Sequence, residues 1–141
     1  MGKLKGLEPE RVFYYFEELS KIPRCSYNEK GVSDYIKSVG EKLGLETLQD
    51  DLLNVIIRKP ASKGYEDSPG VIIQGHMDMV CEKDDRSGHD FTKDPISLIV
   101  DGDYILADKT TLGADNGIAV AMGLAVLEDN SLDHPSIEVL I

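Results

Sequence analysis

Basic residues are few in this sequence of 141 residues. The 15 lysines and arginines stand against 26 aspartates and glutamates, which gives a formal net charge of −11 and a pI near 4.6. Nucleic acids and anionic membrane surfaces both attract basic proteins, so this charge argues against either as a partner. The hydrophobic content of 41% is that of a globular chain, and the length suits one domain with a buried core.

Cysteines, leader sequences and glycosylation signals are also scarce or missing. Cys25 and Cys81 lie far apart and form no CxxC pattern, so neither a zinc ribbon nor a dithiol redox motif is indicated. We expect two free, buried thiols. The sequence opens without an apolar leader, contains no long apolar run and has no N-x-S/T site, so we expect a cytoplasmic protein.

Apolar periodicity predicts two helices near the start of the chain. Val12, Phe16 and Leu19 recur at helical spacing, which predicts a helix over 9–21. A second apolar stripe predicts a helix over 27–43. This helix is introduced by Ser26-Tyr27-Asn28-Glu29, which fits a capping box.

The rest of the chain alternates strand and helix signals. Short apolar runs predict extended segments at 45–58, 71–74 and 137–141, and a hairpin over 96–107. The run at 71–74 is typical of a strand buried on both faces. Residues 117–127 carry no charge and predict a helix that is buried nearly all round. This alternation predicts an α/β sandwich with a mixed, partly parallel sheet.

A His-x-Asp pair follows the apolar run at 71–74. Side chains two positions apart on an extended segment point to the same face, so His76 and Asp78 can meet. A histidine that binds a metal through one ring nitrogen commonly donates its other N–H to a carboxylate. We therefore take His76 as a candidate metal ligand and Asp78 as the site residue that orients it. Ligands of α/β sheets gather at such carboxyl ends of strands.

A second candidate, Asp115, lies in the turn Gly113-Ala114-Asp115-Asn116-Gly117, just before the uncharged helix. The glycines allow a tight backbone, and a helix N-terminus stabilises a carboxylate. A carboxylate can also bridge two metal ions about 3.5–4 Å apart. The alternative is a helix N-cap, because most isolated pairs of this kind are ordinary polar contacts. Spacing alone leaves both interpretations open.

Several of these motifs together resemble a known family. The segment 74–83, Gln-Gly-His-Met-Asp-Met-Val-Cys-Glu-Lys, is similar to the first metal motif of the aminoacyl-histidine dipeptidases. Further similar segments follow in the same order at 89–91, 94–96, 101–103, 110–118 and 134–135. These enzymes are co-catalytic dizinc peptidases of the acetylornithine deacetylase superfamily. Cys81, where the wider superfamily usually has proline, favours the Xaa-His dipeptidase branch.

The resemblance implies a role for each candidate residue. His76 corresponds to a terminal ligand of one zinc ion, Asp78 to the aspartate that orients it, and Asp115 to the carboxylate that bridges both ions. It also implies a cis peptide bond between Asp115 and Asn116. Cobalt or manganese would suit the same mixed nitrogen and oxygen ligands. The implied fold is the three-layer sandwich of zinc exopeptidases, the implied substrate a small peptide, and the implied assembly a homodimer.

Other elements of the family's site have no counterpart in residues 1–141. The adjacent glutamate pair, a later aspartate, a distant histidine and the lid domain are all missing. We therefore expect this chain to be the N-terminal part of a longer catalytic domain, inactive by itself. Two alternatives for the function stay open: a related tripeptidase or N-acyl amino acid amidohydrolase, and a non-catalytic binding module if the chain is complete at Ile141.

Overall fold

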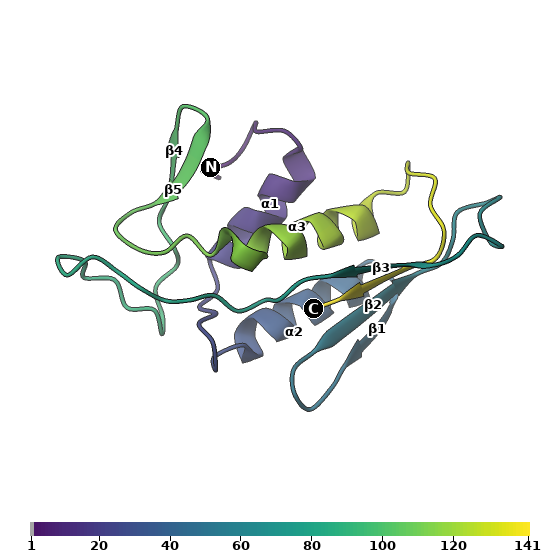
Figure 1. The fold of residues 1–141 in the computed structure, drawn as a ribbon, viewed down its shortest axis with the longest axis horizontal. Coiled ribbons are helices and arrows are strands. Elements are labelled where there is room, and N and C mark those ends of the chain that lie inside the picture. The colour runs from purple at the N-terminus through teal and green to yellow at the C-terminus, as the bar shows by residue number, and fades with distance from the viewer. Residues whose placement is uncertain (1) are drawn as a thin grey trace.

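The computed structural model describes residues 2–141 as three helices and six strands (Figure 1). The helices are α1 (Glu10–Ser20), α2 (Lys30–Lys42) and α3 (Ala114–Glu128). The strands are β1 (Glu46–Gln49), β2 (Val55–Lys59), β3 (Val71–Gln74), β4 (Leu98–Asp101), β5 (Tyr104–Ala107) and β6 (Ile137–Leu140). No helix among residues 2–141 is long and apolar enough to cross a membrane.

Four strands form one mixed sheet in the order β1-β2-β6-β3. The pairs β1–β2 and β2–β6 are antiparallel, whereas β3 and β6 run parallel, with Ile73 opposite Val139. The parallel pair is separated in sequence by α3, as a crossover connection requires. The α/β class and the mixed, partly parallel sheet predicted from the sequence are therefore confirmed.

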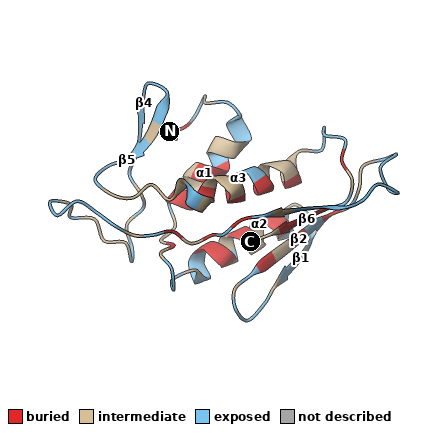
Figure 2. Cartoon of the chain, viewed as in Figure 1, coloured by how far each residue is buried: buried red, intermediate tan, exposed pale blue. Residues whose placement is uncertain are grey.

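Both helices that touch this sheet lie on the same face. Gly40 of α2 lies against Ile57, and Gly123 of α3 lies against Val139 and Ile73. Ile57, Val139 and Ile73 are register partners and so share one face. Figure 2 shows the buried residues concentrated between this face and the helices. Residues 2–141 thus supply two of the three layers expected of the sandwich, and α1 packs outside them on α3.

The opposite face of the sheet is polar or exposed. Arg58 forms ion pairs there with Glu46 at 2.7 Å and with Glu138 at 2.8 Å. Ile72 of β3 lies on this face, opposite Glu138, and is 65% exposed. Val71 lies on the helix side of β3, yet it is still 47% exposed. The prediction that this strand is buried on both faces is wrong, because β3 lies at the edge of the sheet and the described helices cover one side of it.

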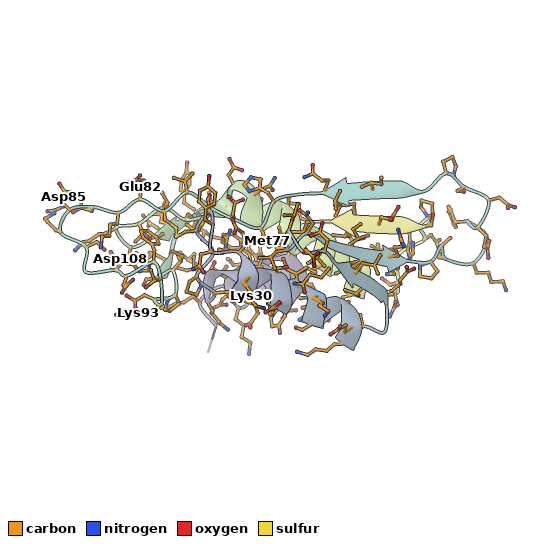
Figure 3. All side chains as sticks on the ribbon, turned by 90° about the horizontal axis from the view of Figure 1, so that it is seen from below. Lys30, Met77, Glu82, Asp85, Lys93 and Asp108 are labelled. Carbon is orange, nitrogen blue, oxygen red and sulfur yellow. A yellow bond between two sulfur atoms is a disulfide. The ribbon has the colours of Figure 1, made fainter. Side chains whose placement is uncertain are left out.

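Two predicted local structures have different outcomes. The hairpin is confirmed: β4 and β5 pair across a tight turn and form a separate two-stranded sheet. Figure 3 shows Glu82, Asp85, Lys93 and Asp108 at the end of the molecule that is remote from the main sheet. The capping box is wrong, because α2 begins at Lys30 with no side-chain cap.

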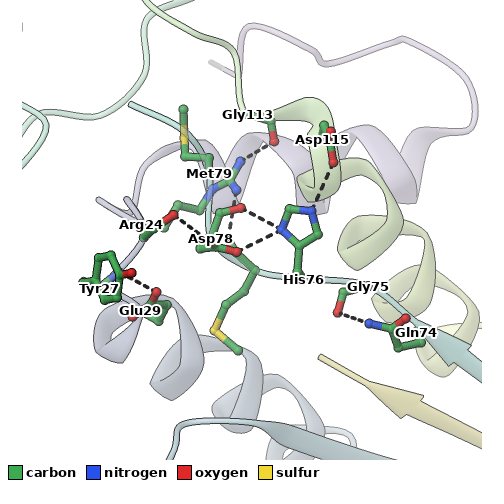
Figure 4. A network of polar contacts seen from close by, with 12 residues as sticks. Arg24, Tyr27, Glu29, Gln74, Gly75, His76, Asp78, Met79, Gly113 and Asp115 are labelled. Carbon is green, nitrogen blue, oxygen red and sulfur yellow. Dashed lines mark hydrogen bonds and ion pairs between the residues drawn. The ribbon is translucent and has the colours of Figure 1, made fainter. Parts of the chain in front are cut away.

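The uncharged stretch 117–127 of helix α3 is buried on most of its circumference. Its buried residues include Val120, Ala121, Leu124 and Leu127, and Met122 is the one residue beyond its first turn that is largely exposed, at 50%. The prediction of a nearly enclosed helix is therefore confirmed apart from Met122. The N-terminal end of α3 faces the segment that follows β3, which places the Asp115 turn next to His76 (Figure 4).

Candidate metal centre

His76 and Asp78 lie on an irregular segment directly after β3. Nδ1 of His76 is 2.9 Å from Oδ1 of Asp78 and 3.1 Å from the Asp78 carbonyl oxygen. The predicted contact between the two side chains is thus present. With its N–H donated from Nδ1 to these oxygens, a neutral imidazole carries its free lone pair on Nε2. This is the tautomer that a histidine ligand binding through Nε2 requires.

Nε2 of His76 points at Asp115. The distance from Nε2 to Oδ1 of Asp115 is 3.1 Å, and Figure 4 shows the two side chains facing each other across the site. A lone pair and a carboxylate oxygen repel each other, so either a proton or another cation belongs between these atoms. Two donors on one tetrahedral zinc ion lie roughly 3.4 Å apart at ordinary bond lengths, close to the separation seen here.

The turn that carries Asp115 has an unusual backbone. Gly113 adopts a left-handed conformation with φ of 74° and occupies the N-cap position of α3, and no side chain caps the helix. Asp115 itself has non-helical backbone angles, with φ of −90° and ψ of 102°, but its carboxylate contacts His76. Among the described residues no backbone N–H of α3 donates to it, so the N-cap interpretation of Asp115 is wrong. The peptide bond between Asp115 and Asn116 is cis, as the resemblance implied. The Asp115 side chain is 95% exposed, so its outer oxygen is free to take a further partner.

Polar contacts shift the pKa values of two of these groups in opposite directions. Partial burial acts to lower the pKa of His76, but hydrogen bonds to Asp115 and Asp78 outweigh it and raise the pKa above its ordinary value. The pKa of Asp78 is lowered, first by the hydrogen bond from Ser26 and then by His76. Asp78 is thus a stable carboxylate at neutral pH, as an orienting acceptor must be.

Ser26 is a site residue that the sequence analysis missed. Its hydroxyl donates to Oδ2 of Asp78 at 2.5 Å, so it does not cap α2. Glu29, the other end of the predicted capping box, accepts instead from the backbone N–H of Tyr27. Nothing in the spacing between positions 26 and 78 signals this contact, because it depends on how the segment after α1 lies against the segment after β3.

Cys25 and Cys81 are joined by a disulfide, with their Cα atoms 5.7 Å apart. The prediction of free thiols is wrong. Cys25 pairs with Met79 in an isolated parallel bridge, which brings the segment after α1 alongside the segment after β3 and so places Cys81 beside Cys25. The disulfide therefore links the segment that carries Ser26 to the segment that carries His76 and Asp78.

The donor set fits part of a metal site. Among residues 2–141, no group of three or more histidine, cysteine, aspartate or glutamate side chains is arranged to hold a metal ion. The direct donors are His76 and Asp115, whereas zinc takes four ligands, at least three of them from the protein. The two donors are of the right kind, and a complete site needs further groups.

An open groove borders this site. Its volume is about 630 Å³, and its lining includes His76, Asp78, Gln74, Asn54 and Asp50. A larger groove of about 960 Å³ lies between the start of α1 and the end of α3, but it contains none of the three candidate residues. We relate function to the smaller groove because the polar groups converge there.

Several solved structures that are similar to this chain are peptidases. The aminoacylhistidine dipeptidase of Vibrio alginolyticus matches with a TM-score of 0.94 and 41% identity, over 97% of this chain and 28% of its own. A tripeptidase from Staphylococcus aureus matches with a TM-score of 0.75 and 24% identity, over 96% of this chain and 36% of its own. A dinuclear metal-binding peptidase of the M20 family from Bacillus subtilis matches more distantly, at 0.54 and 17%.

Sequence comparison points to the same group. The cytosol non-specific dipeptidase of Escherichia coli strain K12 is 42% identical over all 141 residues. No family model matches the chain. The chain spans 29% of the length of this relative and 28% of the length of the Vibrio enzyme. The resemblance to the aminoacyl-histidine dipeptidases is thus confirmed over the length of this chain.

Proposed function

We propose that this chain is the N-terminal part of the catalytic domain of a metal-dependent dipeptidase that prefers Xaa-His substrates. The observation that carries the proposal is the line of contacts from Asp78 through both nitrogens of His76 to Asp115. It occurs in a chain whose sequence is 41% identical to that of an aminoacylhistidine dipeptidase with a similar fold. Sequence and geometry thus support the same chemistry.

Each of the three residues has a distinct task in this proposal. Asp78 holds the Nδ1 proton and so directs the Nε2 lone pair outward. His76 would hold an ion through Nε2, and the exposed carboxylate of Asp115 would supply oxygen ligands to the two ions. Bound ions would supply an activated water and would polarise the scissile carbonyl. The general base and the remaining ligands are proposed to lie beyond residue 141, so residues 1–141 alone are inactive.

Zinc is the proposed metal, in two ions. One imidazole and one carboxylate are ordinary zinc ligands. Cobalt and manganese suit the same donors, so metal analysis of the purified protein decides among them. The Bacillus subtilis neighbour is a dinuclear metal-binding peptidase, which supports the count of two.

We also propose a small peptide substrate, a cytoplasmic location and a homodimer for the complete protein, with neither nucleic acid nor membrane as a partner. The E. coli relative is called a cytosol enzyme, which supports the location. The Cys25–Cys81 disulfide stands against it, because disulfides are rare in reducing compartments. The state of these two cysteines in protein purified under thiol-blocking conditions therefore bears on the location.

A related tripeptidase is the second candidate, because the Staphylococcus aureus tripeptidase has the same fold. The test is a substrate panel with the complete gene product and added zinc: Gly-His, β-Ala-His, a tripeptide and an N-acetyl amino acid. Preferential cleavage of the histidine dipeptides supports the proposal. Turnover of the tripeptide alone, or of the N-acetyl amino acid alone, would replace it with the corresponding alternative. No turnover of any substrate would favour a binding module.

A further inference from the structure

Arg24 is a buried cation placed between the two segments that carry the candidate ligands. It follows α1, and only 1% of it is exposed. Its Nη1 donates to the carbonyl of Met77 at 2.9 Å, and its Nη2 donates to the carbonyl of Gly113 at 2.7 Å. Figure 4 shows the guanidinium reaching from its own loop to the Gly113 turn.

The two carbonyls belong to opposite halves of the site. Met77 stands between His76 and Asp78, and Gly113 precedes Asp115 by two residues. Among the described residues, one hydrogen bond joins segments 75–79 and 113–117 directly, the one between His76 and Asp115. Arg24 joins them indirectly, because it bonds to a carbonyl in each. Further from the site the same two stretches of chain are joined directly, because Thr111 forms hydrogen bonds with Val80 and Glu82. Beside the candidate ligands themselves the planar guanidinium makes the connection, and its fork of donors suits two fixed acceptors.

The glycines of the Asp115 turn leave room for this guanidinium. A Cβ at Gly113 would lie 2.6 Å from Nη2 of Arg24, and a Cβ at Gly117 would lie 2.7 Å from the same atom. At either distance a Cβ would force the guanidinium to move. The turn that presents Asp115 therefore closes around Arg24. This close approach explains why both positions are occupied by glycine.

Burying the charge of Arg24 in the interior is energetically unfavourable. Burial lowers the pKa of Arg24 to about 10, so the group stays protonated at neutral pH. It has no salt bridge among the described residues, although the nearby charge of Asp78 acts to raise its pKa. Burying a cation without a paired anion is unfavourable, and its hydrogen bonds to carbonyls offset only part of that cost.

We propose that Arg24 is a positioning residue of the metal site, an inference that rests on the proposed function. By holding the Met77 and Gly113 carbonyls on one rigid group, it sets the distance at which Nε2 of His76 faces Asp115. Loss of the guanidinium loosens the spacing of the two segments at the site, although the bonds of Thr111 to Val80 and Glu82 still hold them further along. Metal binding therefore weakens even where the fold survives.

The test uses the complete gene product and a matched control. Lys59 is also buried, at 6% exposure, and its Nζ donates to two carbonyls, those of Val126 and Asp129. These lie at the other end of α3, away from the site. Arg24→Met and Lys59→Met therefore remove the same kind of interaction, one beside the ligands and one remote from them.

Zinc affinity by chelator competition and thermal melting are measured on both variants. We expect both substitutions to lower Tm, and Arg24→Met alone to weaken zinc binding by about tenfold to a hundredfold, the range for groups that support metal ligands. Arg24→Lys should fall between, because one ammonium replaces a two-armed donor. Equal zinc affinity in wild type and Arg24→Met, or equal losses in Arg24→Met and Lys59→Met, would overturn the proposal.

A metal-free readout separates this inference from the proposed function. In hydrogen exchange, Arg24→Met should expose the amides of 75–79 and 113–117, whereas Lys59→Met should leave them protected. Should Arg24→Met not fold, Gly117→Ala displaces the guanidinium without removing it and should give the same exchange pattern. If the wild-type protein has no zinc affinity, the proposed function is wrong. If the amides of 75–79 and 113–117 stay as protected in these variants as in the wild type, the proposed role of Arg24 is wrong.

Discussion

Ser26 and His76 bind opposite oxygens of one carboxylate. The Ser26 hydroxyl donates to Oδ2 of Asp78 at 2.5 Å, and Nδ1 of His76 lies 2.9 Å from Oδ1. With both oxygens engaged, the Asp78 carboxylate cannot rotate freely, and the imidazole plane is fixed in turn. The orientation of the candidate ligand is thus set by a chain of three side chains that starts in the loop after α1.

Ser26→Ala should therefore weaken metal binding without unfolding the protein. The substitution removes one hydrogen bond to a charged group, worth about 1.5–3 kcal/mol in general, and part of that loss reaches the metal through His76. We expect zinc affinity of the complete protein to fall several-fold in a chelator competition. Ser38→Ala is the control, because the Ser38 hydroxyl bonds only to a carbonyl within its own helix, that of Tyr35. Equal zinc affinity in both variants would contradict this coupling.

The imidazole of His76 should titrate above its ordinary pKa in metal-free protein. Hydrogen bonds to two carboxylates favour the protonated ring over the desolvation that opposes it. The midpoint of the His76 ring resonances in an NMR titration should lie above about 6.5 and should move down in Asp115→Asn. Because a ligand must be unprotonated, zinc binding should weaken as the pH falls through that midpoint. A midpoint at or below the ordinary value would refute this prediction.

The short chain 1–141 should bind zinc weakly. His76 and Asp115 are its only candidate inner ligands, and no cluster of three or more suitable side chains exists among residues 2–141. We expect His76→Ala to change this weak affinity little in the short chain, whereas it should abolish dipeptide hydrolysis in the complete protein. Isothermal calorimetry on the short chain is the measurement. Tight binding of two zinc ions per chain would show that further ligands are present.

Cys25 and Cys81 should be unreactive to thiol reagents until a reductant is added. The disulfide closes a loop of 56 residues, for which the chain-entropy account gives about 4 kcal/mol of stabilisation. Reduced protein should therefore melt at a lower temperature, and Cys25→Ser should reproduce the loss. Two reactive thiols in protein prepared without reductant would count against the bond.

The local parts of this structure follow from local patterns. The charge-free segment predicted α3, and two-residue alternation predicted the contact between His76 and Asp78. The burial of β3 (Val71–Gln74), by contrast, depends on its place at the edge of the sheet. That place is set by the order of all four strands, so it could not be predicted from the four residues of β3 alone.

The missed site residues have the same explanation. Arg24, Cys25 and Ser26 each act on a segment more than 50 positions away, through contacts that no sequence spacing marks. Ser26 even carried a competing local signal, the apparent capping box. The pair His76 and Asp78 could be predicted because the two residues lie only two positions apart. Their supporting residues could not, because support comes from tertiary packing.

We propose that His76 and Asp115 form half of a two-metal site. The most direct test is an anomalous difference map from crystals of the complete gene product grown with zinc. We predict two peaks about 3.5–4 Å apart, with Nε2 of His76 on one ion and the Asp115 carboxylate between both. A map without a peak at these two side chains, with His76 still hydrogen-bonded to Asp115, would contradict the account.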